Sequence, residues 1–157
     1  MPNRYRLWTH GAAVIVEHTK EFTDDDNGLY MRRAGWGALI KQKKGTSNWF
    51  HFAIPTPIEI ANNPVLILQA WLRIRASNDA LIDQVHVREA PGPNSSCPII
   101  YDSGPLTYGG NNSSWNFDIY GDHVCKGPLL LCIHVVFNND DSEVVFAGAG
   151  GVFKEVT

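Results

Sequence analysis

Residues 65–76 read VLILQAWLRIRA, and this stretch decides the fold class because its side chains alternate in character. Successive side chains of a β-strand point to opposite faces of a sheet. One face of the segment is apolar and carries Ala70, Leu72, Ile74 and Ala76. The other face is polar and aromatic and carries Gln69, Trp71, Arg73 and Arg75. The pattern predicts a half-buried strand whose outer face is unusually rich in large side chains.

The rest of the chain repeats this signal between clusters of Gly, Pro, Asn and Asp. Strands are predicted at residues 7–16, 29–41, 49–54, 65–76, 81–89, 99–102, 115–120, 129–137 and 144–153. No convincing amphipathic helix interrupts them, so the sequence predicts an all-β fold. The short link Ser77-Asn78-Asp79 predicts an antiparallel hairpin between the strands on either side.

The number and spacing of these strands favour a two-sheet antiparallel β-sandwich of jelly-roll type. An immunoglobulin-like sandwich is the alternative, although the Cys-Trp-Cys spacing of antibody-type domains is missing. A length of 157 residues suits one hydrophobic core, and the long polar stretches resemble loops rather than linkers. We therefore expect a single domain over residues 1–157.

Charge and hydropathy narrow the classes of partner. The chain has 13 Lys and Arg against 16 Asp and Glu, a net charge of -3, so no overall positive field favours nucleic acid. No apolar run approaches the roughly 20 residues of a membrane span. The first residues lack the apolar core of a signal peptide. A cytoplasmic protein without a nucleic-acid or membrane partner is expected.

No motif for a metal or cofactor stands out, and we expect none to be bound. The histidines form no H-x-H or H-E-x-x-H pair. Asp24-Asp25-Asp26-Asn27-Gly28 fails the EF-hand spacing, which favours a solvated turn and leaves calcium binding open. Gly148-Ala149-Gly150-Gly151 lacks the Lys of a phosphate loop and favours a bulge. Reduced, structural thiols are expected at Cys97, Cys125 and Cys132.

Several other predicted strands share the polar and aromatic outer face. Trp49 and His51 alternate with phenylalanines, and His86 and Arg88 alternate with valines. If these faces lie together, they form a ligand-binding surface of Trp49, His51, Trp71, Arg73, Arg75, His86, Arg88 and Tyr120. Aromatic rings among hydrogen-bonding groups suit sugars and other small polar molecules. An ordinary solvent face with a few large residues is the alternative.

Three functions fit this pattern. The first is a module that binds a small molecule or a carbohydrate. The second is a cofactor-independent enzyme, such as an isomerase or cyclase, in which His51, His86 or Asp118 moves protons. The third is a structural protein that assembles into a homo-oligomer through its sheet edges or an exposed aromatic patch. Binding ranks first because the pattern shows a polar aromatic face and no ordered catalytic set. His134, in an apolar strand, is interpreted as bound to a backbone carbonyl rather than as a catalytic base.

Three segments also resemble a family of small all-β proteins of unknown function. They are Trp8-Thr9-His10-Gly11, residues 33–37 (RAGWG) and residues 45–57 (GTSNWFHFAIPTP). The resemblance is confined to the first part of the chain and implies no catalytic residue. It implies that residues 48–57 form a signature segment, which favours a role for Trp49 and His51.

Overall fold

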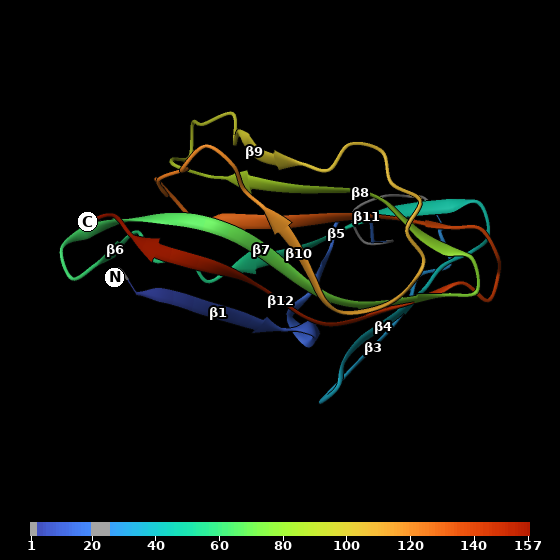
Figure 1. Cartoon of the computed structure of the whole chain (residues 1–157). Coiled ribbons are helices and arrows are strands. Elements are labelled where there is room, and N and C mark those ends of the chain that lie inside the picture. The colour runs from blue at the N-terminus through green and yellow to red at the C-terminus, as the bar shows by residue number, and fades with distance from the viewer. Residues whose placement is uncertain (1–2, 20–25) are drawn as a thin grey trace.

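A computed structural model describes residues 3–19 and 26–157. The described residues contain no α-helix, and their strands form two antiparallel sheets packed face to face (Figure 1). The all-β, two-sheet, jelly-roll-like sandwich predicted from the sequence is therefore confirmed. None of the described helical segments is long and apolar enough to cross a membrane. The candidate calcium loop lies partly outside the described residues, at Asp24 and Asp25.

The first sheet is built on two long strands, β7 (Asn63–Ser77) and β12 (Glu143–Glu155), which pair along most of their length. Its other strands are β10 (Gly110–Asp118), β4 (Gly37–Lys41), β1 (Arg4–His10), β3 (Tyr30–Ala34) and β6 (Glu59–Ile60). β10 pairs with the other edge of β7. One edge of β12 pairs with β7. The other edge pairs with two strands, β4 along its first part and β1 along its second.

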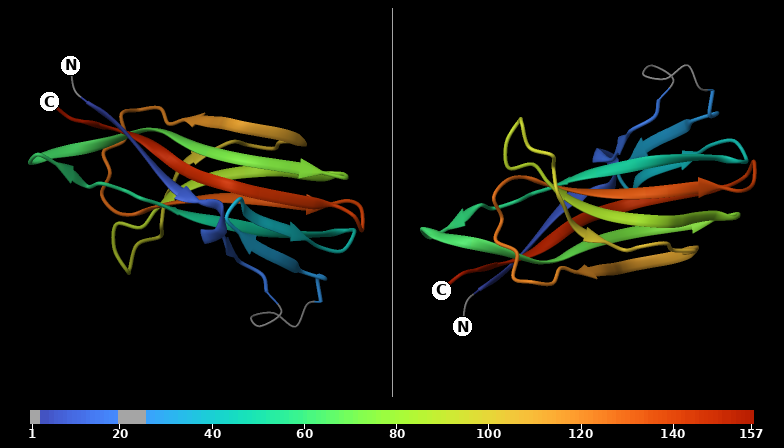
Figure 2. Two further views of the ribbon diagram at one scale, coloured as in Figure 1. Left: turned by 90° about the horizontal axis from the view of Figure 1, so that it is seen from below. Right: turned by 90° about the horizontal axis from the view of Figure 1, so that it is seen from above.

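The second sheet forms the opposite layer of the sandwich (Figure 2) and has the order β2-β5-β11-β8-β9. Its strands are β2 (Ile15–Val16), β5 (Thr46–Ile54), β11 (Leu129–Phe137), β8 (Ala80–Glu89) and β9 (Ile99–Asp102). β11 lies at the centre, so that Cys132 is opposite His51 of β5 on one side and His86 of β8 on the other. This register sets the neighbours of every outward side chain in the sheet.

The hydrophobic core lies between the two sheets and takes its residues from the inward face of each strand. Phe50 and Phe52 of β5 meet Phe146 of β12, with ring centroids 5.3 and 5.5 Å apart. Burying such a side chain stabilises a fold by about 2 kcal/mol. Since Phe50 and Phe52 face inward, the alternating residues Trp49 and His51 face outward.

The predicted hairpin between residues 65–76 and 81–89 is wrong. The chain turns at Asn78 and Asp79, which have φ values of 54° and 64°, and β7 and β8 then enter different sheets. Both edges of β7 are occupied by β10 and β12, and both edges of β8 by β9 and β11. The outer faces of β7 and β8 therefore lie on opposite sides of the sandwich.

The largest other differences from the structure concern three predicted strands. The predicted strand 29–41 is two strands, β3 and β4, joined at Gly35 and Trp36. The predicted strand 7–16 is interrupted by a short 3-10 helix at Gly11–Ala13. The polar stretch at residues 104–114 is predicted to be a loop, but β10 already begins at Gly110, because pairing with the edge of β7 outweighs the low strand propensity of Gly and Asn.

Candidate functional site

The outer face of the second sheet is hollowed beside Trp49. This hollow, here called the Trp49 pocket, has a volume of about 320 Å³ and is lined by Glu17, Trp49, His51, His86, Arg88, Leu130 and Cys132. The lining comes from three adjacent strands and the chain that follows β2, and strand pairing brings them together. Four of the candidate residues from the sequence meet here: Trp49, His51, His86 and Arg88.

Three imidazole rings surround the Trp49 indole. The centroid of the indole lies 4.9 Å from that of His134 and 5.2 Å from that of His86. The His51 ring is 6.5 Å away and parallel to the indole within 6°. Packing on several sides restricts the rotamers of Trp49, so a ligand that contacts this ring loses little side-chain entropy on binding.

Each of these imidazoles has a carboxylate beside it. The pairs are His51–Glu17 at 3.1 Å, His86–Asp102 at 3.3 Å and His134–Asp83 at 2.6 Å. A hydrogen bond from the Gly104 backbone N–H is the main cause that lowers the pKa of Asp102, and the nearby His86 acts in the same direction. Asp102 is therefore ionised at neutral pH. The pocket offers both donors and acceptors to a polar ligand.

Two buried ring nitrogens of the pocket lack a hydrogen-bond partner among the described residues, namely Nδ1 of His51 and Nε2 of His86. The Asp102 carboxylate is 3.3 Å from the latter but is not aligned for a hydrogen bond. Buried polar atoms are nearly always paired with protein or water. Both atoms are buried, so a ligand hydroxyl group reaches either nitrogen only after the side chains that cover it move.

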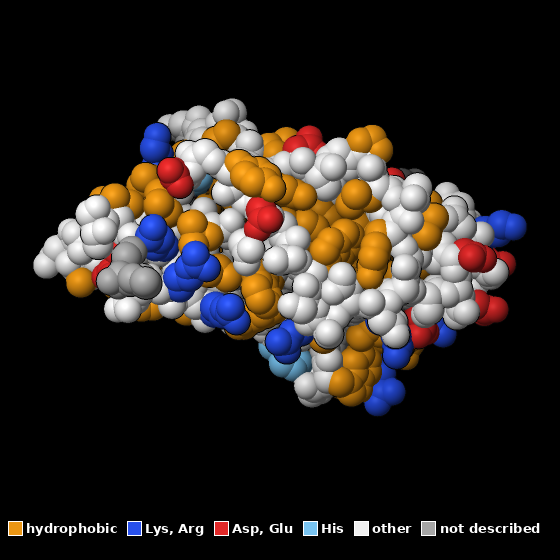
Figure 3. Space-filling view, in the orientation of Figure 1, with side chains coloured by type: hydrophobic (Ala, Val, Ile, Leu, Met, Phe, Trp, Pro, Cys, Tyr) orange, Lys and Arg blue, Asp and Glu red, His pale blue; other side chains and the backbone are white. Residues whose placement is uncertain are grey.

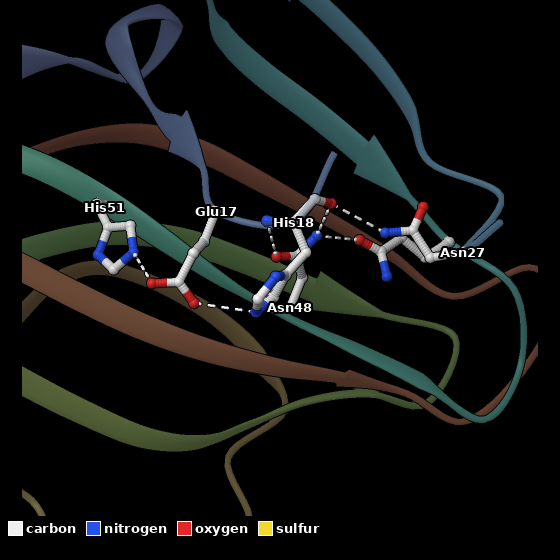
Figure 4. Close-up of polar contacts among 6 residues, drawn as sticks. Glu17, His18, Asn27, Asn48 and His51 are labelled. Atoms are coloured by element: carbon white, nitrogen blue, oxygen red, sulfur yellow. Dashed lines mark hydrogen bonds and ion pairs between the residues drawn. The ribbon is translucent and has the colours of Figure 1, made fainter. Parts of the chain in front are cut away.

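Asn48 fixes the segment that carries Glu17 (Figure 4). The Asn48 side chain is buried, accepts a hydrogen bond from the His18 backbone N–H at 3.0 Å and donates one to the His18 carbonyl at 2.9 Å. The Asn27 amide donates to the same carbonyl at 3.0 Å. The Glu17 carboxylate is thereby held between the rings of His51 and His18, each 3.1 Å away.

Leu130 and Cys132 supply the less polar part of the pocket. Burial raises the pKa of the Cys132 thiol to about 11, although the Arg88 charge acts in the opposite direction. The group is therefore a neutral thiol at physiological pH and a poor nucleophile. Among residues 3–19 and 26–157, no three His, Cys, Asp or Glu side chains converge in a way that could hold a metal ion.

The other candidate residues lie elsewhere. Trp71, Arg73 and Arg75 are on β7, on the outer face of the first sheet and so on the opposite side of the sandwich. Tyr120 follows the end of β10 and is 84% exposed. Asp118 is also on the first sheet and accepts a hydrogen bond from Gln69 at 2.7 Å. The candidate set is thus divided between two faces, and only His51 and His86 of the three catalytic candidates share a pocket.

Glu17, Leu130 and Cys132 line the pocket and His134 packs against Trp49, but none of these four is among the ligand-binding candidates from the sequence. The sequence predicts that His134 bonds a backbone carbonyl, and this is wrong, because the ring contacts Asp83 and Trp49 instead. The alternation along residues 129–137 places Leu130, Cys132 and His134 on one face, a signal that could have identified them. The three pairing carboxylates, Glu17, Asp83 and Asp102, come from separate segments, and no local pattern indicates which imidazoles they lie beside.

No protein-family model matches the sequence, and no curated protein matches it. Solved structures resemble the fold at low identity. A low-affinity xylan-binding module, CBM86, from the gut symbiont Roseburia intestinalis is 10% identical, with 100% of this chain and 96% of that chain covered and a TM-score of 0.46. TmCBM61 in complex with β-1,4-galactotriose is 9% identical over 94% and 88% of the two chains, with a TM-score of 0.44. The CBM36-1 domain of a multidomain xylanase from the hindgut metagenome of Trinervitermes trinervoides is 11% identical over 99% and 98%, with a TM-score of 0.40.

Proposed function

We propose that the protein binds a carbohydrate or another small polar molecule in the Trp49 pocket. The observation that carries the proposal is an indole packed among three imidazoles beside a pocket of about 320 Å³. A sugar presents apolar C–H faces to an aromatic ring and hydroxyl groups to its surroundings. The volume lies at the lower end of the range of small-molecule sites, which suits one or a few sugar rings.

The polar lining supports a neutral ligand. Arg88 donates one hydrogen bond to the Cys97 carbonyl at 3.2 Å, which anchors the guanidinium and leaves other donors for a ligand. Glu17 supplies negative charge in the same pocket. The opposite signs offset each other, so hydroxyl groups, which pair with either, match this pocket better than a charged ligand does.

The histidine–carboxylate pairs favour one alternative, a cofactor-independent enzyme. His51 and His86 lie on either side of Cys132, and each has a carboxylate that can orient its ring. Such groups serve as general acid and general base when a substrate lies between them. Asp118 is too far from this pair to take part, because it lies on the other sheet.

The two functions are separated by following the fate of the ligand. Neutral oligosaccharides and polar metabolites are screened by thermal shift, and each hit is measured by calorimetry and then recovered by chromatography. Binding predicts that the ligand is recovered unchanged. Catalysis predicts a product whose formation His51→Asn or His86→Asn abolishes while affinity is kept. The absence of a hit across broad panels contradicts both.

A matched pair of tryptophans locates the site. Trp49→Ala is expected to weaken binding about 30-fold or more, since a buried aromatic anchor contributes at least about 2 kcal/mol. Trp36→Ala removes an indole that is 45% exposed on the β3–β4 turn, and it is expected to leave affinity unchanged. An equal loss in both variants contradicts the assignment to the Trp49 pocket.

The cellular location and the oligomeric state of the protein remain predictions. A cytoplasmic location is supported by three unpaired cysteines, which suit a reducing compartment. A homo-oligomer joined through sheet edges is supported by the exposed side chains of Tyr30 on β3 and Ile99 on β9. Light scattering over a range of concentrations tests the oligomer, and a mass equal to one chain throughout contradicts it.

A further inference from the structure

The outer face of the first sheet carries a second aromatic cluster, remote from the Trp49 pocket. The indoles of Trp8 on β1 and Trp71 on β7 meet edge to face, with centroids 5.5 Å apart and planes at 88°. β12 lies between these strands, and its Gly150 is opposite both tryptophans. A Cβ atom at Gly150 would lie 2.2 Å from the Leu7 carbonyl oxygen. Glycine therefore allows β1 to approach and the two indoles to meet over β12.

Arginines cover both indoles. The guanidinium of Arg6 lies 5.0 Å from the centroid of Trp71, and that of Arg73 lies 4.6 Å from the centroid of Trp8. The indole N–H of Trp71 donates to Gln69 at 2.8 Å. A ring face that already contacts a guanidinium is not open to stacking with a sugar or a base. The cluster therefore presents positive charge rather than a bare aromatic surface.

The positive charge of this face is only partly neutralised. Glu143 pairs with Arg75 at 3.2 Å and with Lys41 at 3.6 Å. Among the residues that the structure describes, neither Arg6 nor Arg73 has a salt-bridge partner. Figure 3 shows Lys and Arg side chains gathered along β1 on this side of the molecule. Two guanidiniums, fixed in place by the indoles beneath them, are thus available to an anion.

The surface beside Arg73 is hollowed on both sides. A hollow of about 300 Å³ is lined by Trp8, Thr9, His10 and Arg73, among others. A second hollow of about 200 Å³ is lined by Arg73, Arg75, Asn111, Asn112 and Ser113, among others. Arg73 and Ala147 belong to both, so the hollows adjoin in one groove that crosses the sheet, here called the Arg73 groove.

We propose that the Arg73 groove binds an acidic polysaccharide, a chain of sugars that carry carboxylates. The planar guanidinium of Arg73 lines the groove, and that of Arg6 lies beside it over Trp71, the neighbour of Trp8; both match carboxylates in charge and geometry. The second hollow exposes mainly apolar surface, which suits the C–H faces of the sugars between the carboxylates. Single-stranded nucleic acid fits less well, because its bases need free aromatic faces, and a guanidinium lies over one face of Trp8 and over one face of Trp71.

The test uses the whole chain with three probes: polygalacturonate, the neutral polysaccharide dextran, and oligothymidylate. The wild-type protein is expected to bind polygalacturonate, and to bind it more weakly as the sodium chloride concentration is raised. It is expected not to bind dextran. Arg6→Gln and Arg73→Gln are each expected to reduce affinity about tenfold, the effect of one charge-assisted hydrogen bond. Arg73→Lys keeps the positive charge but not the planar guanidinium. It is expected to reduce the affinity for polygalacturonate less than Arg73→Gln does.

Arg32→Gln is the matched control, because Arg32 also lies over an exposed indole, 5.9 Å from Trp36, but outside the groove. It changes net charge equally and is expected to keep the affinity of the wild type. Three results overturn the proposal: no binding of polygalacturonate, an equal loss in Arg32→Gln, or tighter binding of oligothymidylate. Trp49→Ala is expected to leave polygalacturonate binding intact, so this proposal and the proposed function can fail separately.

Discussion

The rings of Trp49 and His134 lie 4.9 Å apart, although the two residues come from different strands. They are paired in register across β5 and β11, and both side chains face away from the core. His134 is itself fixed by Asp83, whose carboxylate oxygen is 2.6 Å from Nδ1 of the ring. The position of the Trp49 indole thus depends on three strands, which makes it a rigid element of the pocket rather than a mobile surface side chain.

Asn48→Ala is expected to lower the free energy of unfolding by about 2 kcal/mol, because it leaves buried polar partners unpaired. The variant is also expected to bind the ligand of the Trp49 pocket more weakly, since Glu17 is no longer held against His51. Urea denaturation measures the first effect and calorimetry the second. Asn94→Ala, at an exposed loop position, serves as the control and should change stability by about 0.5 kcal/mol or less. Similar losses in the two variants would contradict a clamping role for Asn48.

Gly150→Ala is expected to separate β1 from β12, because the added Cβ atom would lie 2.2 Å from the Leu7 carbonyl oxygen. The expected result is a lower melting temperature, with amide hydrogens of β1 exchanging faster than those of β11. Thermal denaturation and hydrogen exchange measure the two effects. Gly92→Ala, where nothing lies within 4 Å of the new atom, is the matched control. Unchanged protection of β1 in Gly150→Ala would show that the close approach is not needed.

Stability is expected to fall in alkali because of the buried thiols. Burial raises the pKa of Cys125 from 9.0 to about 12. The unfolded thiol releases its proton near the lower value and the folded thiol only near the higher one, so this contribution is complete below pH 9 and is lost as pH rises toward the folded pKa. The stability difference between wild type and Cys125→Ala should therefore shrink between about pH 9 and 11. Val87→Ala removes no titratable group, so its stability difference from the wild type should stay constant over the same pH range. Curves of stability against pH that run parallel to the wild type for both variants would contradict the expected effect of Cys125.

Local alternation was enough to predict much of the fold and part of the site. Trp49 and His51 alternate with two core phenylalanines, and β11 has the predicted bounds, residues 129–137. These features depend only on the alternation of side chains along one strand, which can be read from the sequence of that strand alone. The same period predicts that His86 and Arg88 face outward, whichever strands lie beside β8.

The pairing of distant segments could not be predicted from the same pattern. Asn78 and Asp79 have the composition of a hairpin turn. The strands that they join, β7 and β8, nevertheless belong to different sheets, because both edges of each strand pair with other strands. This crossing removes Trp71 and Arg73 from the Trp49 pocket. Glu17 lines the pocket and Asp102 pairs with its His86, and both lie at the ends of edge strands, where only the completed sheet defines what lies beside them.

The central claim, that the Trp49 pocket is the ligand site, is tested most directly by the indole N–H signals of 15N-labelled protein during titration with a panel of neutral oligosaccharides. The chain has five tryptophans, and the spectrum of Trp49→Phe assigns the signal that matters. We predict that a binding sugar shifts the Trp49 signal progressively and leaves that of Trp36 unchanged. A sugar that binds while the Trp49 signal stays fixed, or that shifts Trp8 and Trp71 instead, would contradict the claim.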